Sequence, residues 1–85
     1  MRVSLIIVAR IVDALYKEGA MKKTRLQMAS RLNYPAFMRY LRWLEERGIV
    51  TLVERKDGEY IALTEKGLET YEKLVMWVRE YLGNF

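Results

Sequence analysis

The segment from residue 22 to residue 63 constrains the fold more than any other part of this chain. Its first half has helical character on both sides of a break that contains Asn33 and Pro35. Its second half holds two apolar runs on either side of Asp57 and Gly58, and Asp-Gly between such runs is a strong signal for a β-hairpin. We therefore expect two short helices joined by a tight turn and followed directly by a hairpin.

Capping residues predict where the first two helices begin and end. Ser4 is a candidate N-cap for a helix that runs to about Lys17, and Gly19 is its expected stop. Thr24 is the candidate N-cap of a second helix, which ends near residue 30 or 31. The first helix is apolar on nearly all sides, which predicts burial against more than one neighbour.

The third helix is expected from about Tyr34 to Arg47, with Asn33 as its N-cap and Gly48 as its stop. Pro35 falls in its first turn, where the missing N–H has no cost. At about 100° per residue, the helix has an apolar and a polar face. The apolar face holds Phe37, Leu41 and Leu44, and the polar face holds Pro35, Arg39, Arg42 and Glu46.

The last helix is expected at residues 65–82, with Thr64 as its N-cap. Its apolar residues alternate at spacings of three and four, which is typical of a coiled-coil seam and predicts a dimerisation helix. A second stripe lies beside this seam, and the apolar first helix is a candidate contributor to the same interface. The predicted interface residues are Leu5, Val8, Leu68, Tyr71, Leu74, Val75, Trp77, Val78, Tyr81 and Leu82.

Charge is distributed unevenly along the chain. Residues 1–44 hold nine Lys or Arg against two Asp or Glu, a net charge of +7, whereas residues 45–85 have a net charge of −3. The positive charge coincides with the two short helices, as binding to phosphate requires. This coincidence favours DNA binding over the alternative of an ordinary solvated basic helix face.

The candidate DNA contacts follow from their positions. Arg39 and Arg42 lie on one ridge of the third helix, and Arg can bond guanine O6 and N7 in bidentate fashion. Cations at the start of the second helix suit phosphate. Asp57 and Glu59 partly cancel the charge at the hairpin tip, so that site is the weaker one. The contacts predicted in this way are Lys22, Lys23, Arg25, Arg31, Arg39, Arg42, Trp43, Arg55 and Lys56.

Composition limits the other classes of function. The 85 residues contain neither cysteine nor histidine, which removes thiolate metal sites and the commonest general base. We therefore expect no enzyme, no catalytic residue, no metal and no cofactor. The apolar run of residues 5–9 is interrupted by Arg10 and Asp13, too soon for a membrane span. We expect a cytoplasmic, nucleoid-associated protein without a membrane partner.

Residues 19–26, 32–34, 39–41, 44–48 and 60–67 resemble the small archaeal winged-helix DNA-binding proteins, which include chromatin proteins and predicted transcriptional regulators. The resemblance spans nearly the whole chain. It implies a homodimer held by antiparallel C-terminal helices, with two winged-helix domains on duplex DNA. It also implies DNA contacts by Lys22, Lys23, Thr24, Arg25, Tyr34, Arg39 and Arg42. The last helix here departs from the family in being short and rich in aromatic residues.

The expected fold is thus mainly α with a small β-hairpin: a winged helix-turn-helix with three helices, a two-stranded wing and a C-terminal dimerisation helix. We expect residues 1–85 to form one domain, since so short a chain has no room for a second core. The favoured function is double-stranded DNA binding by a homodimeric transcriptional regulator. A sequence-independent architectural chromatin protein and a winged-helix module for protein–protein interaction are the alternatives.

Overall fold

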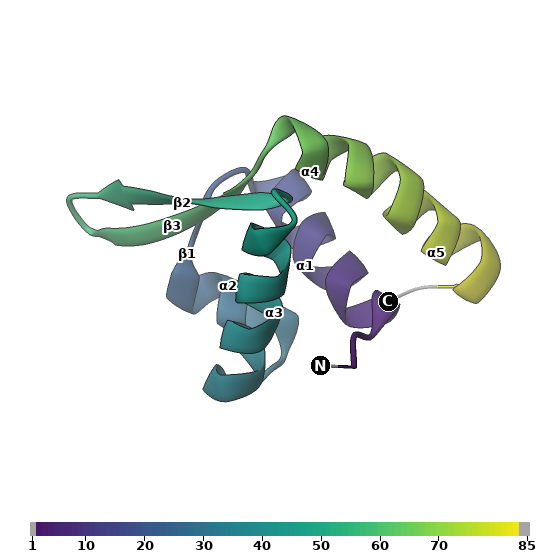
Figure 1. Cartoon of the computed structure of the whole chain (residues 1–85), viewed down its shortest axis with the longest axis horizontal. Coiled ribbons are helices and arrows are strands. Elements are labelled where there is room, and N and C mark those ends of the chain that lie inside the picture. Colours follow the sequence, from purple (N-terminus) through teal and green to yellow (C-terminus); the bar gives the residue numbers. More distant parts are fainter. Residues whose placement is uncertain (1, 84–85) are drawn as a thin grey trace.

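Helix α1 (Leu5–Glu18) lies between two helical layers of the protein (Figure 1). The computed structural model describes residues 2–83. To the lower left of α1 in this view lie α2 (Lys23–Ser30) and α3 (Tyr34–Glu46), which form the expected helix-turn-helix. Above it runs a helical arm of three consecutive segments: α4 (Glu65–Thr70), the π-helical turn η1 (Tyr71–Val75) and α5 (Met76–Leu82).

The hairpin of β2 (Val50–Arg55) and β3 (Gly58–Leu63) projects from the helices as a wing. Arg55 pairs with Gly58, so only Lys56 and Asp57 form the turn. The predicted hairpin is confirmed. A short strand that the sequence pattern did not reveal, β1 (Met21–Lys22), pairs antiparallel with β3. The sheet therefore has three strands in the order β1-β3-β2, not two.

Three of the four predicted N-caps are confirmed. The side chains of Ser4, Asn33 and Thr64 accept hydrogen bonds from the backbone N–H three residues further on. The prediction for Thr24 is wrong, because α2 begins at Lys23 and its N-cap position is Lys22. Strand β1 leads straight into α2, which places Thr24 inside the first turn of that helix.

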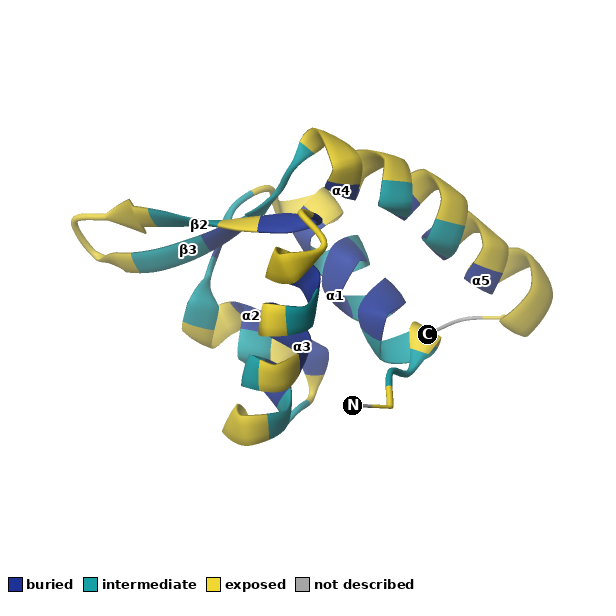
Figure 2. Cartoon of the chain, in the orientation of Figure 1, coloured by how far each residue is buried: buried dark blue, intermediate teal, exposed yellow. Residues whose placement is uncertain are grey.

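The core confirms the faces expected for α3. Phe37, Leu41 and Leu44 are buried, and they pack with buried side chains of α1 and of β3 (Figure 2). Tyr40 is buried as well, and its hydroxyl oxygen accepts a hydrogen bond of 2.9 Å from the backbone N–H of Ser4. Because one face of α3 is anchored to the core, the opposite face is held toward solvent in a fixed orientation.

The expected seam of the last helix serves the core of the monomer. Tyr71, Val75 and Val78 are buried where the helical arm packs on α1, and Val8 is buried on α1. The prediction that these four residues line a subunit interface is therefore wrong, because the monomer itself covers them. The Tyr71 ring stacks on that of Tyr16 with centroids 3.8 Å apart. The spacing of three and four describes any helix that packs along another, whether or not that helix belongs to a second subunit. No helix within residues 2–83 is long and apolar enough to cross a membrane.

Gly67 lies where α4 passes closest to the start of the wing. A Cβ at this position would overlap the carbonyl oxygen of Ile49 and would lie 3.0 Å from Leu63 Cδ2. Backbone oxygen cannot rotate away, so we expect Gly67→Ala to lower the free energy of unfolding by about 1–3 kcal/mol, the usual cost of overpacking. Urea denaturation followed by circular dichroism measures this change. The neighbouring exposed variant Lys66→Ala should stay within about 0.5 kcal/mol of the parent chain, and an equal effect of both would contradict the close approach.

Candidate nucleic-acid interface

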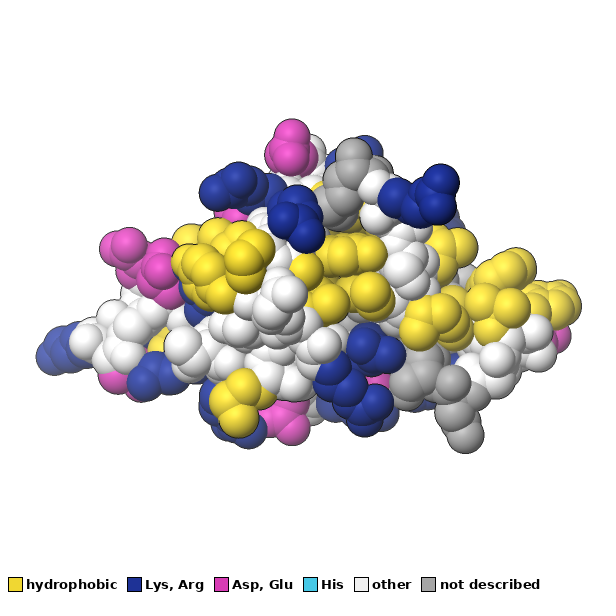
Figure 3. Space-filling view, turned by 90° about the horizontal axis from the view of Figure 1, so that it is seen from below, with side chains coloured by type: hydrophobic (Ala, Val, Ile, Leu, Met, Phe, Trp, Pro, Cys, Tyr) yellow, Lys and Arg dark blue, Asp and Glu magenta, His cyan; other side chains and the backbone are white. Residues whose placement is uncertain are grey.

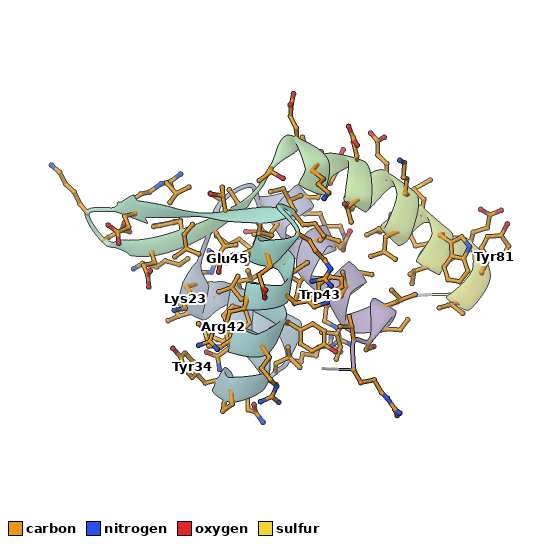
Figure 4. The ribbon with its side chains drawn as sticks, in the orientation of Figure 1. Lys23, Tyr34, Arg42, Trp43, Glu45 and Tyr81 are labelled. Carbon is orange, nitrogen blue, oxygen red and sulfur yellow. The ribbon has the colours of Figure 1, made fainter. Side chains whose placement is uncertain are left out.

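The exposed face of α3 carries two arginines that the rest of the protein leaves available. Within residues 2–83, no hydrogen bond or ion pair engages the side chains of Arg39 and Arg42, and both are exposed. They line two adjoining shallow grooves, one shared with Tyr34 and Met38 and the other with Trp43. Figure 4 shows Arg42 and Tyr34 on the side of α3 that faces Lys23, with Trp43 on the opposite side.

The start of α2 is electrically different from α3, because carboxylates of the wing neutralise its lysines. Lys22 Nζ lies 3.8 Å from Asp57 Oδ2, and Lys23 Nζ lies 3.6 Å from Glu59 Oε1. Lys23 also lies over the ring of Tyr34, 5.9 Å from its centroid. A groove lined by these residues together with Thr24 and Gln27 separates α2 from the wing. Any phosphate that enters this groove competes with two carboxylates for the lysines.

The tip of the wing is held together by its own side chains. The Tyr60 hydroxyl donates a 2.7 Å hydrogen bond to Asp57 Oδ2, and the Arg55 guanidinium lies 4.3 Å from the centre of the Tyr60 ring. This hydrogen bond from Tyr60 lowers the pKa of Asp57, and the same bond raises the pKa of Tyr60. Asp57 is therefore ionised at neutral pH and keeps a negative charge beside Arg55 and Lys56.

The structure brings together only part of the predicted DNA contacts. Lys22, Lys23, Thr24 and Tyr34 share the groove beside the wing, and Tyr34, Arg39, Arg42 and Trp43 share the exposed side of α3. Arg25 points to α1 instead, where its guanidinium lies 3.8 Å from a Glu18 carboxylate oxygen. Arg31 is exposed in the turn after α2 with a φ of 58°. Arg55 and Lys56 lie at the far end of the wing (Figure 1).

Several residues of these grooves were not among the predicted contacts, and Gln27, Met38 and Arg47 are three of them. Each lies four positions after a residue that was predicted to bind DNA, and residues four apart in a helix are neighbours on one face. Extending each predicted contact by one helical turn would have found all three. No group of three or more acidic side chains that could hold a metal ion occurs in the described part of the chain.

The predicted interface residues that remain exposed gather at the α5 end of the molecule. Leu5, Leu74 and Trp77 line an apolar groove between the start of α1 and the helical arm. The rings of Trp77 and Tyr81 lie 5.3 Å apart, and both side chains are exposed together with that of Leu82. Figure 3 shows hydrophobic side chains at this end of the protein, along with others over the rest of the same face. Leu68 is exposed nearer the start of the arm.

A helix-turn-helix followed by a β-hairpin, with the second helix exposed beside that hairpin, defines a winged helix-turn-helix protein. The chain belongs to the winged helix-turn-helix family, whose sequence profile matches residues 1–81. No curated protein sequence matches it significantly.

Solved structures show the same fold. F93 from the archaeal virus STIV, a winged-helix DNA-binding protein, aligns with a TM-score of 0.82 at 22% identity over 92% of each chain. Sso10a-2, a DNA-binding protein from Sulfolobus solfataricus, aligns with a TM-score of 0.76 at 24% identity over 95% of this chain and 85% of its own. Both likenesses confirm the expected winged-helix fold.

The MarR family transcriptional regulator SPO1453 from Silicibacter pomeroyi aligns with a TM-score of 0.75 at 28% identity. The alignment covers 88% of this chain but only 54% of the regulator. The chain thus spans about half the length of that regulator.

Proposed function

We propose that this protein binds double-stranded DNA through α3 and acts as a transcriptional regulator without catalysing a reaction. The observation that carries the proposal is the pair Arg39 and Arg42, exposed and unengaged by the other described residues, on a helix whose opposite face is anchored in the core. A helix presented in this way fits the major groove, where Arg reads guanine. F93 and Sso10a-2, which share the fold, are DNA-binding proteins.

The other cations have supporting roles in this proposal. Lys22 and Lys23, with Thr24 and Tyr34 beside them, bind phosphates next to the base-reading helix once the wing carboxylates are displaced. Trp43 flanks the arginines of α3. The remaining predicted contacts, Arg25, Arg31, Arg55 and Lys56, add long-range attraction for the duplex, which places the protein at the nucleoid.

We further propose that the protein is a homodimer that presents two copies of α3 to two half-sites. The subunit interface uses the apolar residues that the monomer leaves exposed or partly exposed on the helical arm and at the start of α1. These residues are Leu5, Leu68, Leu74, Trp77, Tyr81 and Leu82. The spacing of the two copies of α3 then sets the spacing of the half-sites.

Salt-titrated binding to random and selected duplexes tests the proposal. DNA binding predicts that log affinity falls with log salt by about 0.9 for each phosphate contact. A lack of binding even at low salt would rule out the DNA-binding function and leave protein–protein interaction as the alternative. Equal affinity for every sequence would rule out the regulator and support a sequence-independent architectural protein.

Removing the carboxylates of the wing is predicted to strengthen DNA binding. Because Asp57 and Glu59 compete with DNA phosphates for Lys22 and Lys23, we expect Asp57→Asn with Glu59→Gln to strengthen duplex binding at low salt by about two- to twentyfold, the range for two exposed ion pairs. Fluorescence anisotropy with a labelled duplex measures the change. Glu69→Gln with Glu72→Gln on the helical arm alters net charge equally, and an equal gain there would show that the ion pairs have no specific role.

A further inference from the structure

Arg47, the residue directly after α3, is held in a defined position although it is exposed. Its guanidinium carbon lies 3.9 Å from the centre of the Trp43 ring, and its Nη1 donates a 3.3 Å hydrogen bond to the carbonyl oxygen of Trp43. Both contacts are made to the same residue, one helical turn earlier. Neither contact uses an acidic partner, so the positive charge of Arg47 is not neutralised by them.

The Trp43 ring under Arg47 is anchored in the protein. Trp43 is half-buried and packs against the hydrophobic core. The guanidinium lies over this ring while its remaining N–H groups stay available, because within residues 2–83 no other hydrogen bond engages them. A guanidinium that is already ordered loses less side-chain freedom when it binds an anion.

Arg47 continues the basic surface of α3 beyond its C-terminal end. It lines the same shallow groove as Arg39, Arg42 and Glu46. In helix-turn-helix proteins the N-terminal part of the recognition helix contacts base edges, whereas in the related homeodomain the C-terminal end of that helix reaches the backbone. The position of Arg47 thus suits a phosphate rather than a base, and its planar fork suits bidentate phosphate binding.

We propose that Arg47, stacked on Trp43, is a preformed binding site for a DNA backbone phosphate at the C-terminal end of α3. The inference rests on the proposed function, since it assigns a further contact to the same DNA surface. A purely structural alternative is that Arg47 stabilises the C-terminus of α3 through the helix dipole. That alternative affects folding stability and leaves the salt dependence of DNA binding unchanged.

Duplex binding measured as a function of salt distinguishes these roles. We expect Arg47→Ala to weaken binding about tenfold at low salt, as for loss of a charged hydrogen bond, and to reduce the salt slope by about 0.9. Arg47→Lys keeps the charge and the slope but loses the stacked fork, so only affinity should fall. Trp43→Leu keeps the apolar packing and removes the aromatic ring, and it should behave like Arg47→Lys.

Lys73→Ala on the helical arm is the matched control, because it removes one exposed positive charge away from α3. Since Lys73 lines the groove beside Leu74 and Trp77, all variants are compared on a duplex with a single half-site, where dimerisation plays no part. Thermal unfolding of each variant shows whether the protein remains folded. If Arg47→Ala matches Lys73→Ala in both affinity and slope while the parent protein binds DNA, the role of Arg47 is overturned and the proposed function stands. If the parent protein binds no duplex at any salt concentration, the proposed function is contradicted, and so is the phosphate-binding role of Arg47.

Discussion

Replacing Arg39 and Arg42 together by alanine is expected to weaken duplex binding by at least about thirtyfold, since each bidentate contact to a base contributes about 1–3 kcal/mol. If the two arginines also contact phosphates, the double variant lowers the slope of log affinity against log salt by up to about 1.8. Both side chains are exposed and form no hydrogen bond or ion pair with the described residues 2–83. The double variant should therefore unfold at nearly the same temperature as the parent, so that the loss reports on binding alone. Fluorescence anisotropy across a salt series measures both quantities.

The wing tip offers a control with the same change of net charge. Arg55→Ala with Lys56→Ala also removes two positive charges, but Asp57 already offsets them and Arg55 is stacked on Tyr60. We expect this variant to weaken binding less than about fivefold, in line with loss of weak surface electrostatics. Equal losses in the two double variants would mean that net charge, and not the position of α3, governs binding.

The local elements of this fold could be predicted because single residues specify them. Asn33 and Thr64 each supply a side-chain oxygen to a helix start, and Asp57-Gly58 marks the hairpin. Strand β1 could not be predicted in this way. It has two residues, too few to show an alternating pattern, and it exists because β3 lies alongside it. Tertiary pairing therefore decided the start of α2, against the capping preference of Thr24.

The helical arm shows why periodicity can predict a packed face and still miss its partner. The apolar seam of residues 68–82 predicted burial correctly for its centre, where Tyr71, Val75 and Val78 pack on α1. A chain of 85 residues buries a smaller fraction of its surface than a larger domain does, so the monomer needs the apolar side chains of this seam for its own core. The π-helical turn Tyr71–Val75 also breaks the heptad repeat, so a long two-stranded seam could not continue through it.

In the candidate site, too, local features could be predicted from the sequence and tertiary contacts could not. The exposed position of Arg39 and Arg42 could be derived from the helical period, because the core stripe of α3 fixes the opposite face. The ion pairs of Lys22 and Lys23 with the wing could not, since they join residues 35 or more positions apart through the sheet. Lys22 and Lys23 were predicted to bind phosphate, but the carboxylates of Asp57 and Glu59 already offset their charges.

Replacing Trp77 and Tyr81 together by alanine is expected to convert the proposed dimer into a monomer, with a dissociation constant for the subunits raised at least about a hundredfold. The two side chains are 46% and 64% exposed and lie close to exposed Leu82, and a contiguous exposed apolar patch marks an interaction site. Trp and Tyr are typical hot spots of protein interfaces. Truncation of one hot-spot residue to alanine costs about 2 kcal/mol or more of binding free energy. Sedimentation velocity over a range of concentrations measures the change.

Met28→Ala is the control, because Met28 is an even more exposed apolar side chain on α2, away from the helical arm. The control should leave the dimer intact, whereas a parent protein that stays monomeric at every concentration would contradict the proposed interface. Dimerisation also has a consequence for DNA binding. Because Trp77 and Tyr81 lie outside the basic surface of α3, the monomeric variant should bind a single half-site as the parent does. It should lose affinity only for duplexes with two half-sites, since linked binding of two modules raises the effective concentration of the second.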